Sequence, residues 1–304
     1  MTTDWEATLR SWVKPSSDYE ESKRDTTEKE VRAALAASSR LSQIAYKVYA
    51  KGSYANRTNV RLDYDVDIAV ECTDFYYWDA IGAAADVKKM AEASIQPYGK
   101  SYGPDDFKND VEGALVNHFG RTAVTRGNLA MRVRERKTTL PADVVPCFAY
   151  QYIYGADRSG GLLSHKGTRI FPERGLYLHN WPQQQLDKGI AKNDATGRHY
   201  KRMVRALKRI ENTLVQSKQL SEVPSFLMEC LVYNVPNNLF NHPSYVADMR
   251  DVLAVIFNAT LTDDKCKEWL EASERKYLFH ASQGWSREQA HELASKAWNL
   301  MGLR

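Results

Sequence analysis

A strict alternation of polar and apolar residues marks residues 65–71, which read Asp-Val-Asp-Ile-Ala-Val-Glu. A period of two residues predicts a β-strand, because successive side chains of a strand point to opposite faces. The apolar residues would share one face and Asp65, Asp67 and Glu71 the other, with Asp63 extending the acidic face by one step. Carboxylates this close repel one another unless a cation lies between them. The pattern therefore favours either a cation site or a solvated acidic hairpin.

An apolar segment at residues 48–50 precedes this strand and ends at Gly52-Ser53. Glycine lets a backbone N–H approach a phosphate closely, and the serine hydroxyl adds a second donor. We therefore expect Gly52 and Ser53 to bind a phosphate group beside the acidic strand.

A third carboxylate, Asp143, stands in an apolar segment bounded by prolines, Leu-Pro-Ala-Asp-Val-Val-Pro at residues 140–146. Burying a carboxylate without a partner is costly, so this residue requires a cation or a polar environment. Either it joins the acids of the earlier strand, or it is an ordinary aspartate of a turn or an edge strand.

Helical patterns precede the acidic strand. A short helix near Trp5–Val13 is followed by a polar segment at residues 15–25. A longer helix then begins at Thr26 or Thr27, a residue type that favours helix N-caps. The apolar stripe of this helix leads directly into the Gly-Ser segment, so we expect the helix to brace the site from behind.

Helices and strands are mixed between the acidic strand and Asp143. The pattern predicts helices at residues 79–95 and 104–119, strands at 122–124 and 129–136 with a turn at 126–128, and a strand after Pro141. This order predicts an α+β fold, in which a mixed sheet carries helices on one side.

The pattern becomes wholly helical from about residue 181. Trp181-Pro182 is a suitable boundary between the mixed and the helical pattern. We therefore predict two domains, one at residues 1–180 that carries the acids and one at residues 181–304 that forms a helical lobe.

One helix of this lobe, expected at residues 196–214, carries a basic stripe. Its members share a face at helical spacing: Arg198, Lys201, Arg205 and Lys208. Such a stripe is either a solvated surface or part of an anion site. The following apolar helix has Ser225 as its expected N-cap, where a phosphate could also bind the backbone donors.

Composition narrows the class of protein. The chain has 304 residues, of which 42 are basic and 38 acidic, for a formal net charge of +4. A protein that neutralises many phosphates of a long nucleic acid usually carries a larger excess of positive charge, so no such partner is required. The four cysteines, at positions 72, 147, 230 and 266, lack metal-ligand spacing. Neither a disulfide framework nor a structural zinc is therefore expected.

The N-terminus carries no apolar signal-type segment, and no apolar run reaches the roughly 18 residues that a membrane span needs. We therefore expect a cytoplasmic protein without membrane contact.

The acids together suit divalent metal ions. Hard oxygen ligands favour Mg²⁺ or Mn²⁺, and two such ions about 3.5–4 Å apart can clamp both the attacking and the leaving oxygen of a phosphoryl transfer. With a phosphate-binding Gly-Ser pair nearby, the sequence predicts metal-dependent nucleotidyl transfer.

One motif closely resembles the signature of the DNA polymerase β-like nucleotidyltransferase superfamily: Gly-Ser, eleven intervening residues and then Asp-Val-Asp-Ile. In that superfamily a third acid lies on a later strand. Later elements narrow the resemblance to the cGAS/DncV-like nucleotidyltransferases, or CD-NTases: His-Tyr-Lys-Arg-Met-Val-Arg at residues 199–205 and Pro-Ser-Phe at 224–226. The likeness covers roughly residues 26–235. It implies a polymerase β-like mixed sheet with a long N-terminal helix, packed against a C-terminal helical lobe that completes the nucleotide-binding cleft.

The resemblance assigns Asp65, Asp67 and Asp143 as ligands of two Mg²⁺ or Mn²⁺ ions. Asp143 would also help to activate the acceptor hydroxyl. Asp63 is an additional acid that the family pattern does not require, and we expect it to be structural or to support the metal ligands.

The resemblance also implies that Gly52 and Ser53 hold the donor triphosphate, and that Lys201 and Ser225 clamp it from the helical lobe. Phe226 stands where an aromatic ring can stack on a base, although a place in the core would explain it equally well.

A template-independent enzyme that joins nucleoside triphosphates into a cyclic dinucleotide or trinucleotide, with release of pyrophosphate, is the activity that the resemblance implies. Such a product would serve as a second messenger in bacterial antiphage (CBASS) signalling. The zinc insertion of the vertebrate DNA sensor has no counterpart among the cysteines here, so no nucleic acid is expected to be obligatory. A regulatory protein partner is left open.

Two other classes share parts of this pattern. A linear oligonucleotide synthetase of the oligoadenylate type would use the same catalytic residues, with an RNA-binding groove in its basic surface. A non-catalytic nucleotide-binding protein would keep the fold but lose an acid, and all three acids are present here. Base choice depends on loops that the sequence alone does not place.

Overall fold

The computed structural model describes residues 3–60 and 65–304, so Asp63 lies outside the described residues. The chain forms two compact units. The mixed unit contains residues 18–51 and 65–182, and the helical unit contains residues 183–304 together with the described residues of 1–17 and 52–64. Relative to the predicted domains, 1–180 and 181–304, the first helix and the Gly-Ser segment thus pack with the C-terminal helices.

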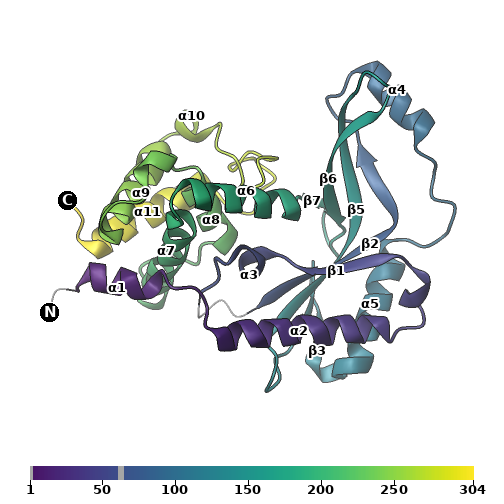
Figure 1. The fold of residues 1–304 in the computed structure, drawn as a ribbon, viewed down its shortest axis with the longest axis horizontal. Helices are drawn as coiled ribbons and strands as arrows, with labels where there is room; N and C mark the ends of the chain where they lie inside the picture. The colour runs from purple at the N-terminus through teal and green to yellow at the C-terminus, as the bar shows by residue number, and fades with distance from the viewer. Residues whose placement is uncertain (1–2, 61–64) are drawn as a thin grey trace. The chain divides into compact units, whose positions relative to one another are not determined.

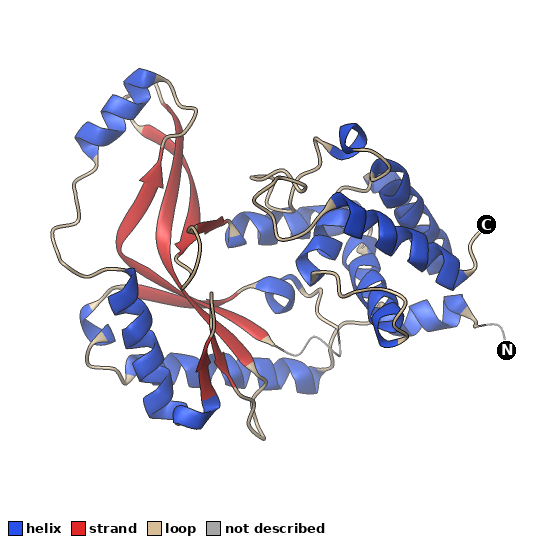
Figure 2. Cartoon of the chain, turned by 180° about the vertical axis from the view of Figure 1, so that it is seen from behind, coloured by secondary structure: helices blue, strands red, loops and turns tan. Residues whose placement is uncertain are grey.

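The mixed unit is built on one seven-stranded sheet (Figures 1 and 2). Its main path runs in the order β1 (Tyr46–Ala50), β2 (Val66–Asp79), β5 (Ala142–Ala156), β4 (Met131–Val133) and β3 (Val124–Arg126). β6 (Leu162–Ile170) pairs with β5, and β7 (Leu178–Asn180) pairs with β6. β2 and β5 are parallel and the other pairs are antiparallel. The predicted α+β class and mixed sheet are confirmed.

The polar and apolar residues of β2 alternate because one face of the strand is buried and the other is not. Val66, Ile68 and Val70 are fully buried, whereas Asp67 and Glu71 are only partly buried on the opposite face. α2 (Asp18–Ala36) and α5 (Pro104–Phe119) pack on each other and on the sheet, and α2 lies along β1 and β2 (Figure 1). The helix predicted at 104–119 is therefore confirmed.

The long N-terminal helix begins earlier than predicted. α2 starts at Asp18, so residues 18–25 are helical and do not form a linker. Acidic side chains in its first turn, including Glu20 and Glu21, favour the positive end of the helix dipole. Thr27, predicted as an N-cap, lies inside the helix, and its hydroxyl accepts a hydrogen bond of 2.8 Å from the Leu140 N–H.

The helix predicted at 79–95 is shorter. β2 continues to Asp79, because the run Phe-Tyr-Tyr-Trp before it favours a strand, and α4 covers only Ala85–Ser94. Two strands are present where 122–124 and 129–136 were predicted, but the first is shifted to β3 (Val124–Arg126) and the second is shortened to β4 (Met131–Val133). The Gly127 N–H donates to the Ala130 carbonyl in the turn between them. Short 3-10 helices lie at Leu41–Gln43, Arg121–Ala123 and Asn237–Leu239.

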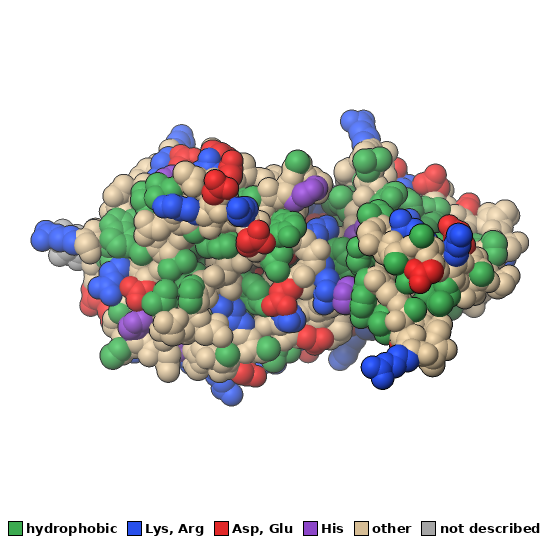
Figure 3. Space-filling model, turned by 90° about the horizontal axis from the view of Figure 1, so that it is seen from above, with side chains coloured by type: hydrophobic (Ala, Val, Ile, Leu, Met, Phe, Trp, Pro, Cys, Tyr) green, Lys and Arg blue, Asp and Glu red, His purple; other side chains and the backbone are tan. Residues whose placement is uncertain are grey.

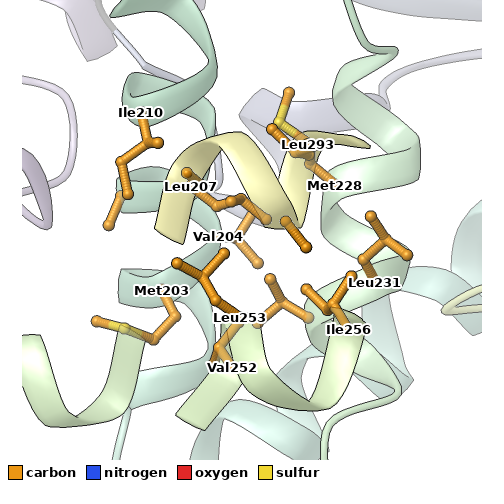
Figure 4. Close-up of a cluster of buried hydrophobic side chains, with 14 of the residues drawn as sticks. Met203, Val204, Leu207, Ile210, Met228, Leu231, Val252, Leu253, Ile256 and Leu293 are labelled. Carbon is orange, nitrogen blue, oxygen red and sulfur yellow. The ribbon is translucent and has the colours of Figure 1, made fainter. Parts of the chain in front are cut away.

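The helical unit surrounds an apolar core. Its helices are α1 (Trp5–Trp12), α3 (Gly52–Asn56), α6 (Pro182–Ala195), α7 (His199–Gln216), α8 (Ser225–Tyr233), α9 (Tyr245–Ala259), α10 (Asp263–Cys266) and α11 (Arg287–Met301). Figure 4 shows how Leu207 of α7, Leu231 of α8, Leu253 of α9 and Leu293 of α11 meet in this core. Leu9 of α1 is buried in the same cluster, which explains why the first helix belongs to this unit.

The helix predicted at 196–214 is interrupted near its start. Gly197 and Arg198 both have left-handed backbones, with φ of 56° and 68°, and they separate α6 from α7. Within the described part of the chain, no helix is long and apolar enough to cross a membrane.

Candidate active site

The predicted acids form a row across three strands of the mixed unit. The parallel register of β2 and β5 places Asp67 opposite Asp143, and the antiparallel register of β4 places Arg132 beside Asp143. Side chains of paired residues share a face of the sheet. Asp65, two residues before Asp67, directly precedes β2 on that face. The structure thus brings Asp65, Asp67 and Asp143 to one place, with an arginine among them.

Arg132 bridges two of the acids. Its Nη2 lies 3.2 Å from Asp65 Oδ2, and its Nε lies 3.4 Å from Asp143 Oδ1. The arginine side chain is 65% exposed, so solvent screens these ion pairs strongly. The guanidinium supplies positive charge at the position where the repulsion between carboxylates demands it.

These acids match a divalent metal in donor type. Carboxylate oxygens are the ligands that Mg²⁺ and Mn²⁺ prefer. Among residues 3–60 and 65–304, no three acidic, histidine or cysteine side chains are close enough to hold one ion in the present arrangement. Arg132 supplies a cation to Asp65 and Asp143 in this arrangement. The three acids therefore have the donor chemistry of the predicted metal site, and the metal site itself stays a prediction.

The backbone around the acidic row is fixed on both sides. The Lys51 N–H donates to the Asp67 carbonyl (2.9 Å), and the Val66 N–H donates to the Pro141 carbonyl (2.9 Å). Beyond the acids, the same face of the sheet becomes apolar at Ala69, Val145, Cys147 and Ile170. Cys147 is a free thiol within this apolar cluster, and burial raises its pKa to about 12.

Gly52 and Ser53 open a short helix of the helical unit. They follow β1 after one residue and form the first positions of α3, where Gly52 adopts φ of 66°. Only glycine takes that left-handed conformation without steric cost. The Thr58 N–H donates to the Ser53 carbonyl (2.9 Å), which closes the turn after α3.

The helical unit also gathers the two other residues assigned to the triphosphate. α3 packs on α8, and α8 packs on α7. Ser225 is the first residue of α8 after Pro224, so the prediction that it is the N-cap is wrong by one position. Phe226 packs on the core with its ring edge-to-face with Trp285, at 5.9 Å between centroids, which supports its core role.

Lys201 lies in the first turn of α7 and is partly buried. Burial lowers the pKa of its ammonium group, and the guanidinium groups of Arg57 and Arg205 act in the same direction. The carboxylates of Glu229 and Asp194 oppose that shift. A partly desolvated ammonium interacts more strongly with an anion than a fully hydrated one.

Two further members of the predicted basic stripe are buried, whereas Arg198 is exposed and precedes α7. Arg205 is 6% exposed and Lys208 is 1% exposed. The Arg205 guanidinium donates to the Val13 carbonyl through Nε (2.9 Å) and Nη2 (2.6 Å), and to the Arg57 carbonyl through Nη1 (2.6 Å). Burial lowers the pKa of Arg205 to about 10. Arg205 and Lys208 are therefore structural, whereas Lys201 is only partly buried.

Comparison with known proteins supports one family. Residues 187–302 match the model of the cGAS/DncV-like nucleotidyltransferase C-terminal helical domain. The chain is 37% identical to a cyclic dipyrimidine nucleotide synthase CdnE of Legionella pneumophila, over 99% of both chains. It is 34% identical to the cyclic dipyrimidine nucleotide synthase CdnE of Cecembia lonarensis, over 96% of both. The chain belongs to the cGAS/DncV-like nucleotidyltransferases.

Solved structures place it in the CdnE clade of this family. The structure of Elizabethkingia meningoseptica CdnE cyclic dinucleotide synthase with GTP and Apcpp is 30% identical, with a TM-score of 0.79 over 98% of both chains. The Rhodothermus marinus CdnE c-UMP-AMP synthase with Apcpp and Upnpp is 25% identical, with a TM-score of 0.82 over 98% of this chain and 96% of that one. The protein is thus a nucleotidyltransferase of the cyclic nucleotide synthase type, and the linear and non-catalytic alternatives lose their support.

Two polar residues of this CD-NTase were missed from the sequence. Arg132 stands between Met131 and Val133, which are buried, so strand alternation already placed it on the opposite face. Glu229 is the only charged residue of α8, and an acid within so apolar a helix signals a buried polar partner. Sequence spacing did not reveal which residues these two side chains contact.

Proposed function

We propose that this enzyme joins pyrimidine nucleoside triphosphates into a cyclic dipyrimidine dinucleotide, and that the product is a second messenger of bacterial antiphage signalling in the cytoplasm. The observation that carries the chemistry is the acidic row, in which strand register aligns Asp67 with Asp143 beside Asp65. The base choice rests on the relatives at 34% and 37% identity, both named cyclic dipyrimidine nucleotide synthases. A relative at 30% identity is named a cyclic dipurine nucleotide synthase, so purine use is the competing outcome.

Asp65, Asp67 and Asp143 would hold two Mg²⁺ or Mn²⁺ ions, which would neutralise charge that develops on the attacking and leaving oxygens. Asp143 is paired with Arg132 in this structure. Once that ion pair is broken, the Asp143 carboxylate would accept the proton of the acceptor hydroxyl. This assignment gives the three acids their roles in the proposed reaction.

Gly52, Ser53, Lys201 and Ser225 would bind the donor triphosphate. The backbone N–H groups at Gly52-Ser53 and the Ser53 hydroxyl are donors for phosphate oxygens, and the Lys201 ammonium adds a positive charge. These contacts would orient the α-phosphate for attack and stabilise the departing pyrophosphate.

Product analysis tests the proposal. The protein should be incubated with each single NTP and each pair of NTPs, α-³²P-labelled, in Mg²⁺ and in Mn²⁺. We expect a labelled cyclic product from UTP, CTP or both without added nucleic acid, and none from the Asp67→Ala variant. Loss of the metal ligand removes charge stabilisation, so turnover should fall by several orders of magnitude.

The matched control is Glu71→Gln, which changes an acid of the same strand that accepts a hydrogen bond from the Tyr49 hydroxyl and has no proposed metal role. It should keep most of the activity. Near wild-type product formation by Asp67→Ala would contradict the active-site assignment. Products made only from ATP and GTP would replace the pyrimidine assignment with a purine one.

A further inference from the structure

Glu229 is a buried carboxylate that is satisfied by neutral donors. It lies in the middle of α8 and is 3% exposed. Its Oε1 accepts hydrogen bonds from Asn56 Nδ2 (2.9 Å) and Gln185 Nε2 (3.0 Å), and its Oε2 accepts one from the Thr58 hydroxyl (2.8 Å). Burying a carboxylate is costly, and several well-placed donors offset that cost. This arrangement has no role yet in the proposed reaction.

Two of these donors belong to the segment that follows the Gly-Ser turn. Asn56 is the last residue of α3, and Thr58 returns a hydrogen bond from its N–H to the Ser53 carbonyl. Between them, Arg57 adopts a left-handed backbone with φ of 53°, which is unfavourable for a residue other than glycine. A conformation of this kind persists only where the surroundings enforce it. Glu229 holds the side chains on both sides of Arg57.

The same carboxylate also reaches α6 and influences Lys201 of α7. Gln185 belongs to α6, and the Ser225 that begins α8 lies one helical turn before Glu229. The Glu229 carboxylate also favours the charged form of Lys201, against the effect of burial and of the cationic Arg57 and Arg205. One side chain of α8 thus connects the segment that follows the Gly-Ser turn, α6 and the environment of Lys201.

We propose that Glu229 is a positioning residue for the donor triphosphate, because it fixes the Gly52-Ser53 turn against the helix that begins at Ser225. This inference rests on the proposed function for the roles of Gly52, Ser53 and Ser225. Glu229 itself touches no phosphate, since its oxygens are occupied by three donors. Its contribution is to preorganise the groups that do.

Glutamine at position 229 tests the role of the carboxylate with little change in volume. An amide has one acceptor oxygen, so its NH₂ group would face a donor of Asn56, Gln185 or Thr58. For Glu229→Gln we expect at least a tenfold rise in the Kd of nonhydrolysable UTP and ATP analogues, measured by calorimetry with Mg²⁺. KM for the substrate should rise similarly, while kcat changes less than threefold.

The matched control is Glu211→Gln. Glu211 is also a buried carboxylate of the helical unit, 3% exposed, and it accepts a hydrogen bond from the Val223 N–H rather than from the 52–58 segment. A purely structural role would make the two variants alike: both would lose thermal stability with unchanged affinity. An affinity change confined to Glu229→Gln supports positioning, and equal affinities in both folded variants would overturn it.

A second variant covers the case in which Glu229→Gln does not fold. Thr58→Val keeps the shape of the side chain but removes one donor to Glu229, and it should weaken analogue binding by about threefold or more; wild-type affinity would overturn the proposal. Binding is measured without turnover, so the result is independent of which product forms. Wild-type binding without a cyclic product would contradict the proposed function while leaving the positioning test intact.

Discussion

Lys201 differs from Arg205 and Lys208 of the same helix in how far it is buried. It is partly buried in the first turn, near Glu229 and Arg57, whereas Arg205 and Lys208 are buried within the helical unit. Loss of its ammonium should therefore weaken triphosphate binding without unfolding the protein. For Lys201→Ala we expect a rise of at least tenfold in KM for the NTP substrate, measured by pyrophosphate release.

The same residue predicts a pH dependence. Its pKa is lowered from the ordinary 10.5, chiefly by burial, and only the protonated form attracts phosphate. Affinity for NTP should thus be full below the lowered pKa and decline as pH rises through it, and this alkaline decline should vanish in Lys201→Ala. Lys265→Ala, at an exposed position of α10, is the control and should leave KM unchanged. Equal, small effects at both positions would return Lys201 to the role of a surface lysine.

Much of the site prediction rested on the alternation of polar and apolar residues. Alternation along β2 predicted that the acids share one face, because the buried face must be apolar and the pleat leaves no other arrangement. The pairing of Asp67 with Asp143 was not derivable, since register across 76 positions depends on how β2 and β5 align. The hydrogen-bond partners of Glu229 were not predictable either, because Asn56 lies 173 positions away in the sequence.

At the scale of elements, α7 is tied to two distant segments by one side chain. Arg205 donates to the carbonyls of Val13 after α1 and of Arg57 after α3. Arg205→Met keeps the apolar stem but leaves those carbonyls without their donor. We expect the free energy of unfolding to fall by about 1.5–3 kcal/mol, the range for hydrogen bonds to a charged group. Urea unfolding followed by circular dichroism measures the change.

The comparison variant for this element is Arg10→Ala. Arg10 is exposed and pairs with Glu6 one turn away, so it should cost less than about 1 kcal/mol. A similar loss at both positions would mean that the Arg205 hydrogen bonds contribute little. A selective loss would show that α7 holds the first helix and the Gly-Ser segment in the helical unit.

Elements were predicted best where local and tertiary preferences agree. The helix at 104–119 has Pro104 and two acids in its first turn and a continuous buried face, and its bounds were predicted without error. The start of α2 was predicted too late, because the charged segment at residues 18–25 was interpreted as a linker. This segment is helical because its acidic residues lie in the first turn of the helix and the rest of α2 packs on α5. The extension of β2 to Asp79 was missed because its partner strand β5 is long, and local sequence does not show partner length.

At the scale of the whole molecule, charge argues against a long polyanion as substrate or activator. The formal net charge is only +4. On the face that Figure 3 shows, Lys and Arg side chains are interspersed with Asp and Glu and form no broad continuous patch. A protein that tracks a nucleic-acid backbone presents a basic stripe, and its affinity falls steeply with salt. Synthesis should therefore proceed without DNA or RNA.

Ring closure makes the final prediction specific. A cyclic product forms only if the linear intermediate presents its own 5′-triphosphate to the donor residues and its free hydroxyl to the acids, so that no terminal phosphate survives. Alkaline phosphatase should therefore leave the chromatographic mobility of the purified product unchanged, whereas a linear 5′-triphosphorylated dinucleotide treated in parallel should shift. Adding duplex DNA or RNA should not raise the yield. A phosphatase-sensitive ladder of increasing length would instead show that the intermediate leaves or is extended before its ends meet, because intramolecular attack wins only while both ends are held in register.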